Sequence, residues 1–291
     1  MLYEVEKRRT IMEKRYLIPK EIVEGNINEG VKKANLPIYK VILLGILAGA
    51  FIALGAQASN LATHAMTNPG LAKTVAGTIF PVGLMMIVVV GGQLFTGNCL
   101  IFMGVLDKKV SIGKMLLNWT LIWFSNMVGG IIISFLVYQS GQFDFNSSSL
   151  AAYTIKVAYG KLHLTPVQAI CSGILCNVIV CIAILMAGAA KDIAGKCIAV
   201  FFPIFAFVVS GFEHCVANMY YIVAGIFASG NPAYVEKAKE LYSFTDSQIS
   251  SINVGNMFVD NLIPVTLGNI IGGAVFVGAV FYIVNKSKEN N

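Results

Sequence analysis

Charged residues are scarce in this chain of 291 residues, at 12% against about 25% in an ordinary soluble domain. Hydrophobic residues make up 56%, so the composition excludes a typical water-soluble fold. No basic patch is interleaved with aromatic residues, so the net charge of +6 indicates no nucleic-acid surface. The first 35 residues lack the apolar core and cleavage site of a secretory signal peptide, and we expect none to be removed.

Residue patterns that hold metals or build catalytic centres are also missing. None of the six cysteines forms a C-x-x-C pair. All six lie in or beside long apolar stretches, where free cysteine acts as a small apolar residue, so we expect no metal and no cofactor. Cys215 would point away from His214 around a helix, and no other nucleophile stands beside a base. We therefore expect no enzyme.

Apolar stretches of at least about 20 residues, the length that spans a bilayer as a helix, recur six times in the chain. The second and fifth are too long for one plain helix. The sequence thus predicts an all-α membrane protein with six transmembrane helices. The stretches lie near residues 38–58, 77–106, 114–138, 166–190, 198–229 and 258–284.

Small and polar residues interrupt the second and fifth stretches near their centres. The interruptions are Gly91–Asn98 (GGQLFTGN) and Ser210–Asn218 (SGFEHCVAN). Ionisable groups and unwound backbone are costly in lipid unless they line a cavity or pack on protein. A matched pair of interrupted helices in the two halves of a membrane chain points to a solute pathway.

The two halves of the chain also repeat each other in order. Gly45–Ala48 matches Gly173–Cys176, and Asn126–Gly130 matches Asn269–Gly273. In each half, one interrupted stretch lies between these two motifs. Three spans per unit turn the second unit over, so we predict an inverted 3+3 repeat. The Gly-Gly pairs are assigned to close helix packing. The predicted parts are an amphipathic N-terminal segment 1–37, a first repeat 38–138, an outer loop 139–165, a second repeat 166–284 and a tail 285–291.

Lysine and arginine are distributed unequally over the two sides of the predicted membrane domain. With six spans, 16 of the 21 basic residues fall on the side of the two termini. By the positive-inside rule both termini are expected in the cytoplasm. The five basic residues on the opposite side are Lys73, Lys156, Lys161, Lys237 and Lys239.

His214 is the only histidine inside a predicted span. An ionisable group at membrane depth is costly, which favours a functional role, and an imidazole titrates close to neutral pH. Thr96 in the opposite interruption offers a hydroxyl, and its neighbouring glycines permit loop conformations that free backbone N–H groups. These donors together could hold one small anion.

Glu213 precedes His214, and on a helix the two side chains would lie about 100° apart. The two would then not face one narrow lumen, so we expect Glu213 to bind exposed backbone at the interruption or to face a neighbouring subunit. Bulky apolar residues near the interruptions either pack ordinarily or, if they face the axis, form constrictions that exclude hydrated ions. These residues are Phe80, Leu84, Leu94, Phe95 and Phe207.

Three ordered motifs resemble the signatures of the formate/nitrite transporter family. They are Leu94–Asn98 (LFTGN), Gly211–Met219 (GFEHCVANM) and Asn261–Asn269 (NLIPVTLGN), and the resemblance covers essentially all six spans. It implies an aquaporin-like inverted-repeat fold, a homopentamer with one pore per protomer, and a prokaryotic plasma (inner) membrane. It also implies passage of small monovalent anions such as formate, nitrite or hydrosulfide, and sometimes acetate or lactate.

The same resemblance assigns roles to single residues. His214 would be the central pore histidine and Thr96 the threonine of the interrupting loop, with Lys161 in the vestibule and Asn177 near the central site. Phe80 and Phe207 would form the outer constriction, and Leu84 would line the pore wall. Leu94 and Phe95 would narrow the inner side. Separately from these assignments, we predict structural support at the interruptions from Glu213, Gly97, Asn98, Asn218 and Asn269.

One position departs from the family pattern, because the residue before Leu-Phe-Thr is often acidic in the family and is Gln93 here. The predicted function is passive or proton-coupled passage of small anions, with formate first and nitrite or hydrosulfide as alternatives. A neutral-solute pore is the weaker alternative. Aquaporins carry paired Asn-Pro-Ala interruptions, whereas Asn68-Pro69-Gly70 and Asn231-Pro232-Ala233 fall in predicted outer loops.

Overall fold

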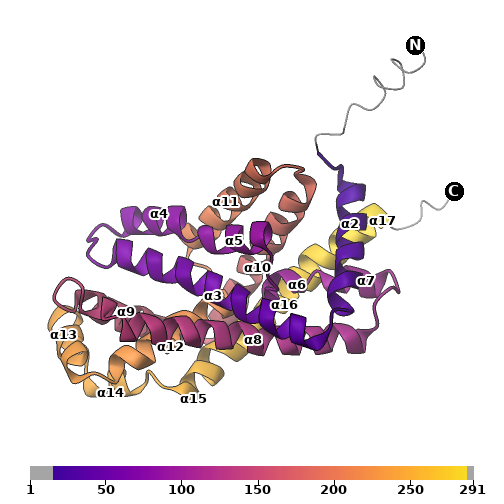
Figure 1. Ribbon diagram of the computed structural model, residues 1–291. Coiled ribbons are helices and arrows are strands. Elements are labelled where there is room, and N and C mark those ends of the chain that lie inside the picture. The colour runs from indigo at the N-terminus through magenta and orange to yellow at the C-terminus, as the bar shows by residue number, and fades with distance from the viewer. Residues whose placement is uncertain (1–15, 287–291) are drawn as a thin grey trace, which may run out of the picture.

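Six helices are long and apolar enough to cross a membrane in the part of the chain that the structure describes, residues 16–286 of a computed structural model (Figure 1). The prediction of an all-α membrane protein with six spans is confirmed. The first five spans are α3 (Ile38–Thr63), α4 and α5 (Pro69–Ile79 and Val82–Val90), α8 (Ile112–Gln139), α10 (Pro166–Ala189) and α11 (Ile193–Ser210).

The sixth span is one long helical run in which α-helical and π-helical turns alternate. Wider π-turns inside a long helix are uncommon and shift which residues share a face. The run consists of α15 (Val254–Asn256), η2 (Met257–Leu262), α16 (Ile263–Ile270), η3 (Ile271–Ala279) and α17 (Val280–Lys286).

The amphipathic segment before the first span forms α2 (Pro19–Ala34). Val23, Ile27 and Gly30 face inward, and the helix packs on α7 and α17. Figure 1 shows α2 and α17 together at the end of the bundle where both termini lie. Residues 1–15 of the predicted N-terminal segment and 287–291 of the predicted tail lie outside the described residues.

Both interrupted spans break where the sequence predicts. The helix α5 ends at Val90 and resumes as α6 (Phe95–Asn98) and α7 (Ile101–Leu106), and α11 resumes after Ser210 as α12 (Cys215–Ser229). Each break opens on a glycine with positive φ, 106° at Gly91 and 72° at Gly211. Residues with a side chain rarely adopt this conformation, so the two glycines set where the helices stop.

Asn126 on α8 holds the first break. Its Oδ1 accepts from the backbone N–H of Phe95 at 2.9 Å. Its Nδ2 donates to the carbonyls of Gln93 at 2.9 Å and Gly45 at 2.8 Å. Because unwound backbone in a membrane needs such partners, this one side chain stabilises the break.

Asn269 on α16 holds the second break in the same way. Its Oδ1 accepts from Cys215 N–H at 3.0 Å, and its Nδ2 donates to Glu213 O at 3.0 Å and to Gly173 O at 2.8 Å. The three bonds match those of Asn126 one for one. The correspondence agrees with the repeat predicted from the sequence.

The two repeats run in opposite directions through the bundle. The first span begins at Ile38, directly after α2 on the side of the termini. The fourth span, α10, instead ends on that side, where Leu17 N–H donates to Ala189 O at 3.1 Å. The predicted inversion of the second unit is therefore present in the fold.

Close helix contacts account for the paired glycines. A Cβ on Gly129 of α8 would overlap the carbonyl of Ile46 on α3, and one on Gly272 of η3 would overlap the carbonyl of Ile174 on α10. These helices touch backbone to backbone, a packing that small residues allow in membranes. The packing assignment is confirmed.

The two long segments between spans on the far side from the termini contain helices and are not simple loops (Figure 1). The predicted loop 139–165 contains η1 (Gln142–Asp144) and α9 (Ser149–Leu162), because Ala151, Ile155 and Leu162 recur on one face and are buried. The segment 230–257 contains α13 (Pro232–Tyr242) and α14 (Asp246–Ser250). Helix α9 packs on α12 and α13.

Candidate functional site

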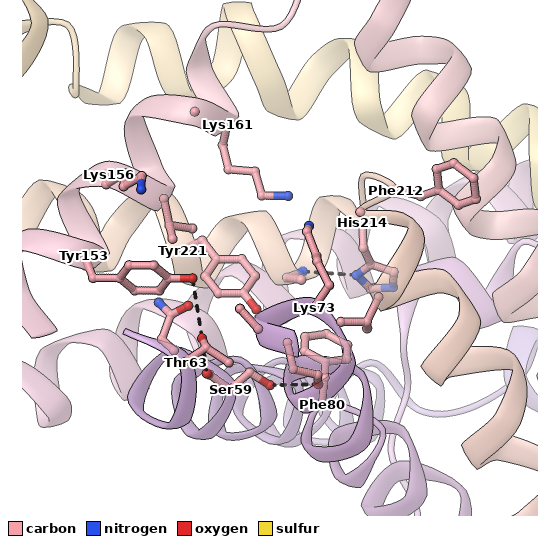
Figure 2. A pocket seen from close by; sticks show the side chains of 18 of the residues that line it. Ser59, Thr63, Lys73, Phe80, Tyr153, Lys156, Lys161, Phe212, His214 and Tyr221 are labelled. Carbon is pink, nitrogen blue, oxygen red and sulfur yellow. Dashed lines mark hydrogen bonds between the residues drawn. The ribbon is translucent and has the colours of Figure 1, made fainter. Parts of the chain in front are cut away.

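A cavity of about 490 Å³ opens between α3, α4, α9, α11 and α12 at the end of the bundle away from the termini (Figure 2). Its walls combine lysines, aromatic rings and hydroxyl groups, and both Gly211 and His214 of the second break line it. The predicted site residues that line this cavity are Phe80, Lys161, Phe207, Glu213, His214 and Asn218.

His214 and Thr96 bring the two breaks together at the closed end of the cavity. His214 Nε2 lies 2.9 Å from Thr96 Oγ1, and the two residues are 118 positions apart in the chain. His214 is 3% exposed and Thr96 is fully buried. Thr96 does not line the cavity, so His214 stands between it and the open space.

The second ring nitrogen fixes the tautomer of His214. Its Nδ1 accepts a hydrogen bond from Ala217 N–H at 3.1 Å and so caps the N-terminus of α12. A neutral imidazole has one donor and one acceptor nitrogen. With Nδ1 accepting, Nε2 carries the hydrogen and donates it to Thr96 Oγ1.

The carboxylate of Glu213 is held closely by two side chains and at 3.5 Å by a third, because Asn261 Nδ2 also donates to its Oε2. Its Oε1 lies 2.6 Å from Lys161 Nζ, and its Oε2 accepts from Asn218 Nδ2 at 2.6 Å. Asn261 of η2 accepts from Asn218 at 2.8 Å and donates to the carbonyl of Lys161 at 2.8 Å. Four side chains from α9, the break, α12 and η2 thus form one network.

Two expectations for Glu213 are wrong. Its carboxylate binds the side chains of Lys161 and Asn218, not exposed backbone. It also lines the same cavity as His214. The expected angular separation assumed helix, whereas residues 212–214 are non-helical and His214 has extended backbone angles.

The predicted constriction residues divide into two groups. The rings of Phe80 and Phe207 meet edge to face with centroids 5.7 Å apart, and both line the cavity. Leu84 and Leu94 are buried outside it. Phe95 packs edge to face on Trp119 and lines a separate apolar groove of about 260 Å³ between α8 and α16.

Asn177 is buried away from the cavity and bridges the two repeats. Its Nδ2 donates to the carbonyl of Thr96 at 3.2 Å and to that of Asn269 at 2.6 Å. The structure therefore places it behind the hydrogen-bonded pair of Thr96 and His214. Gly97 beside Thr96 has room for a Cβ, which would meet Ile184 only at ordinary contact distance.

Comparison with known proteins agrees with this geometry. A model of the family described as formate/nitrite transporter matches residues 20–283, nearly the whole chain. The chain belongs to the formate/nitrite transporter family. It is thus a multi-pass membrane protein of a family of transporters.

Relatives within the family cover nearly the full length of the chain. A probable formate transporter of Methanothermobacter thermautotrophicus is 39% identical over 268 residues, 86% of this chain and 90% of the relative. The formate channel FocA of Escherichia coli (strain K12) is 35% identical over 277 residues, 92% of this chain and 94% of the relative.

Solved structures of the family share the fold. A pentameric formate channel with formate bound is 34% identical, with a TM-score of 0.74 over 85% of this chain and 97% of that chain. An ion channel of the same family is 26% identical, with a TM-score of 0.75 over 91% of this chain and 98% of that chain.

This family member has a second polar cluster around its first break, on the side of the termini. Lys33 Nζ of α2 donates to Asn98 Oδ1 at 3.1 Å, and Asn98 Nδ2 donates to Gln93 Oε1 at 2.8 Å and Asn118 Oδ1 at 2.9 Å. Asn118 donates to the carbonyl of Lys33 at 3.3 Å. Burial lowers the pKa of the Lys33 ammonium, and the charge of nearby Glu29 partly offsets this effect.

The two clusters are counterparts under the internal repeat. Lys33, Gln93, Asn98 and Asn118 correspond to Lys161, Glu213, Asn218 and Asn261, and in each cluster the lysine carbonyl accepts from the last asparagine. The difference is one of charge, because Gln93 stands where the second cluster has a carboxylate. Sequence reasoning noted Gln93 but missed its cluster.

Lys33, Asn118 and Asn261 were not predicted as site residues. Lys33 lies in a charged amphipathic segment, and Asn118 is one polar residue in a long apolar helix. Asn261 lies in the third family motif but was given no role. Only the match between repeats, extended outward from the breaks, would have identified them.

Proposed function

We propose that this protein lets small monovalent anions cross a prokaryotic plasma (inner) membrane, with formate as the first candidate. The observation that carries the proposal is the hydrogen bond between His214 and Thr96 at the closed end of a lysine-lined cavity. A position between two interrupted helices is typical of solute sites in transporters. The relatives named for formate support the choice of substrate.

The proposed assembly is a homopentamer with one pathway in each protomer. Its support is the similarity to a pentameric formate channel. Both termini are proposed to lie in the cytoplasm, because 16 of 21 basic residues fall on their side. In this orientation the cavity opens outward and the Lys33 cluster faces the cell interior.

An anion leaving water for the apolar part of the pathway loses its hydration, at a cost of several kcal/mol even after relaxation. The positive charges of the cavity favour its entry. The edge-to-face rings of Phe80 and Phe207 then form the proposed outer constriction. Leu94, Phe95 and Leu84 are proposed to line the narrow parts beyond it.

At the centre, Thr96 is proposed to replace part of the lost water. Its oxygen already accepts from His214, and in the described chain its hydroxyl has no other partner. The hydroxyl hydrogen is therefore available to an anion that reaches it. Asn177, Asn269 and the glycine at 97 are proposed to support the loop that carries this group.

His214 is proposed to act as a hydrogen-bond donor that stays neutral. Protonating its ring would place a hydrogen on Nδ1, which would break the bond from Ala217 N–H that caps α12. The ring therefore orients Thr96 without lending a proton. A proton that crosses with the anion would then come from water or from the substrate acid itself.

Flux into proteoliposomes tests the proposal. Formate, nitrite and hydrosulfide are each offered to vesicles that hold the purified protein, with and without a pH gradient, and flux and current are recorded. We expect formate to cross, and His214→Asn to reduce its flux strongly although asparagine can still cap α12. His163→Asn is the matched control, because His163 is exposed at the C-terminal end of α9, and it should leave flux unchanged.

The possible results separate the alternatives. Faster flux of nitrite or hydrosulfide would keep the pathway and change the substrate. Electroneutral, pH-coupled flux would show passage with a proton, and a matching current would show passage of the bare anion. Unchanged formate flux in His214→Asn, or entry of water and glycerol without any anion, would refute the proposal.

A further inference from the structure

Three lysines line the cavity, and they differ in what they contact. Lys161 is paired with Glu213 at 2.6 Å, and the other carboxylate oxygen is bound to Asn218. The side chain of Lys161 is 19% exposed and that of Glu213 is 6% exposed. In such a protected pair the two charges largely cancel, so Lys161 alone adds little net positive charge.

Lys156 is also engaged. Its Nζ lies 4.5 Å from the centroid of the Tyr242 ring, a cation–π contact at the outer rim of the cavity. This contact lies on α9 and α13, away from the second break. Lys156 therefore adds charge to the rim but not to the closed end.

Lys73 of α4 is the remaining lysine of the cavity. Within the described chain it makes no hydrogen bond, ion pair or ring contact. Figure 2 shows its side chain reaching into the cavity, with its amine between Lys161 and His214. A lysine ammonium is a strongly hydrated charge with three donors, so an amine without a protein partner is available to a ligand.

The second break approaches this amine closely. A Cβ on Gly211 would lie 2.8 Å from Lys73 Nζ. Gly211 precedes Glu213 and His214 in the chain, and its lack of a side chain leaves the space in which the ammonium lies. The positive φ of 72° at Gly211 keeps this position a glycine for a second, independent reason.

We propose that Lys73 is the cation that binds the monovalent anion in the cavity, before the anion passes Phe80 and Phe207. The inference rests on the proposed function and names the residue that holds the anion there. Lys161 then acts mainly to neutralise and position Glu213. A small anion bound at Lys73 lies beside the His214 end of the cavity, so the binding position is next to the central site through which the anion passes.

The test compares charge variants in oriented proteoliposomes. Lys73→Gln removes the charge, Lys73→Arg keeps it, and Lys156→Gln removes a charge from the rim of the same cavity. We expect Lys73→Gln to raise the half-saturation concentration for formate entering from the cavity side by about fivefold or more, as expected for a lost charge contact at partial screening. Lys73→Arg should restore most of the affinity, and Lys156→Gln should change it little.

Two outcomes would overturn the inference. One is an unchanged half-saturation concentration in Lys73→Gln. The other is an equal increase in Lys73→Gln and Lys156→Gln, which would show general attraction by the rim. Increasing salt should weaken binding to the wild type more than to Lys73→Gln. If the wild type moved no anion at all, the proposed function would fail first, so the two failures are distinguishable.

Discussion

The ion pair between Lys161 and Glu213 shows how strongly one residue in this protein depends on another. Lys161 lies on α9, and Glu213 lies in an unwound segment 52 positions later. Neither charge has a counterpart elsewhere in the network, because Asn218 and Asn261 are neutral. Removing one partner would leave a buried charge without compensation.

We therefore expect Lys161→Met to lower the free energy of unfolding by about 3 kcal/mol. The uncompensated Glu213 carboxylate causes the loss. Adding Glu213→Gln to this variant should recover much of it, since glutamine can still accept from Asn218. Thermal unfolding of the detergent-solubilised protein measures both variants, and a double variant no more stable than the single one would contradict this explanation.

At the scale of elements, the broken spans depend on one asparagine each. Asn269 is fully buried and satisfies three backbone groups around the second break. Each buried backbone group that loses its partner costs roughly 1–3 kcal/mol. The break is thus stable only while the neighbouring helix supplies these hydrogen bonds.

Replacing Asn269 with Leu should lower the free energy of unfolding by at least about 3 kcal/mol, since three bonds are lost together. Asn60→Leu is the matched control, because Asn60 is buried but its Nδ2 has no partner in the described chain. Denaturant titration of the two variants makes the comparison. Equal effects would mean that buried volume, not backbone bonding, determines the cost.

The elements were predictable where the sequence repeats or is uniformly apolar. The six spans follow from hydropathy, and both breaks follow from the glycines that interrupt two of the apolar stretches. Helix α9 was expected as loop because its polar residues, among them Lys156 and Lys161, interrupt a short apolar face. The partners of Glu213 were not predictable, because a residue in non-helical backbone has no periodicity from which its direction can be inferred.

At the scale of the whole molecule, the inverted repeat builds two polar clusters that differ in charge. The cluster near the cavity contains both Lys161 and Glu213, while its counterpart contains Lys33 and the neutral Gln93. Lys73 beside the first cluster and Lys33 within the second each form no ion pair with a carboxylate in the described part of the chain. The substitution of Gln93 for an acid therefore balances the two ends rather than merely losing a contact.

This balance predicts the effect of Gln93→Glu. The new carboxylate would keep the acceptor for Asn98 and place a negative charge beside the cluster of Lys33, as Glu213 does beside Lys161. We expect the half-saturation concentration for formate entering from the side of the termini to rise about fivefold, because the charge of Lys33 is neutralised. Entry from the cavity side should keep its affinity.

Oriented vesicles measure the two directions separately, and a double-mutant cycle with Lys33→Met identifies the cause. If neutralisation of Lys33 explains the effect, Gln93→Glu should have little further influence once Lys33 is methionine. An equal effect in both backgrounds would mean that the carboxylate repels the anion directly. Equal changes in both directions would show that the two ends are not independent, and the charge balance would then have no bearing on transport.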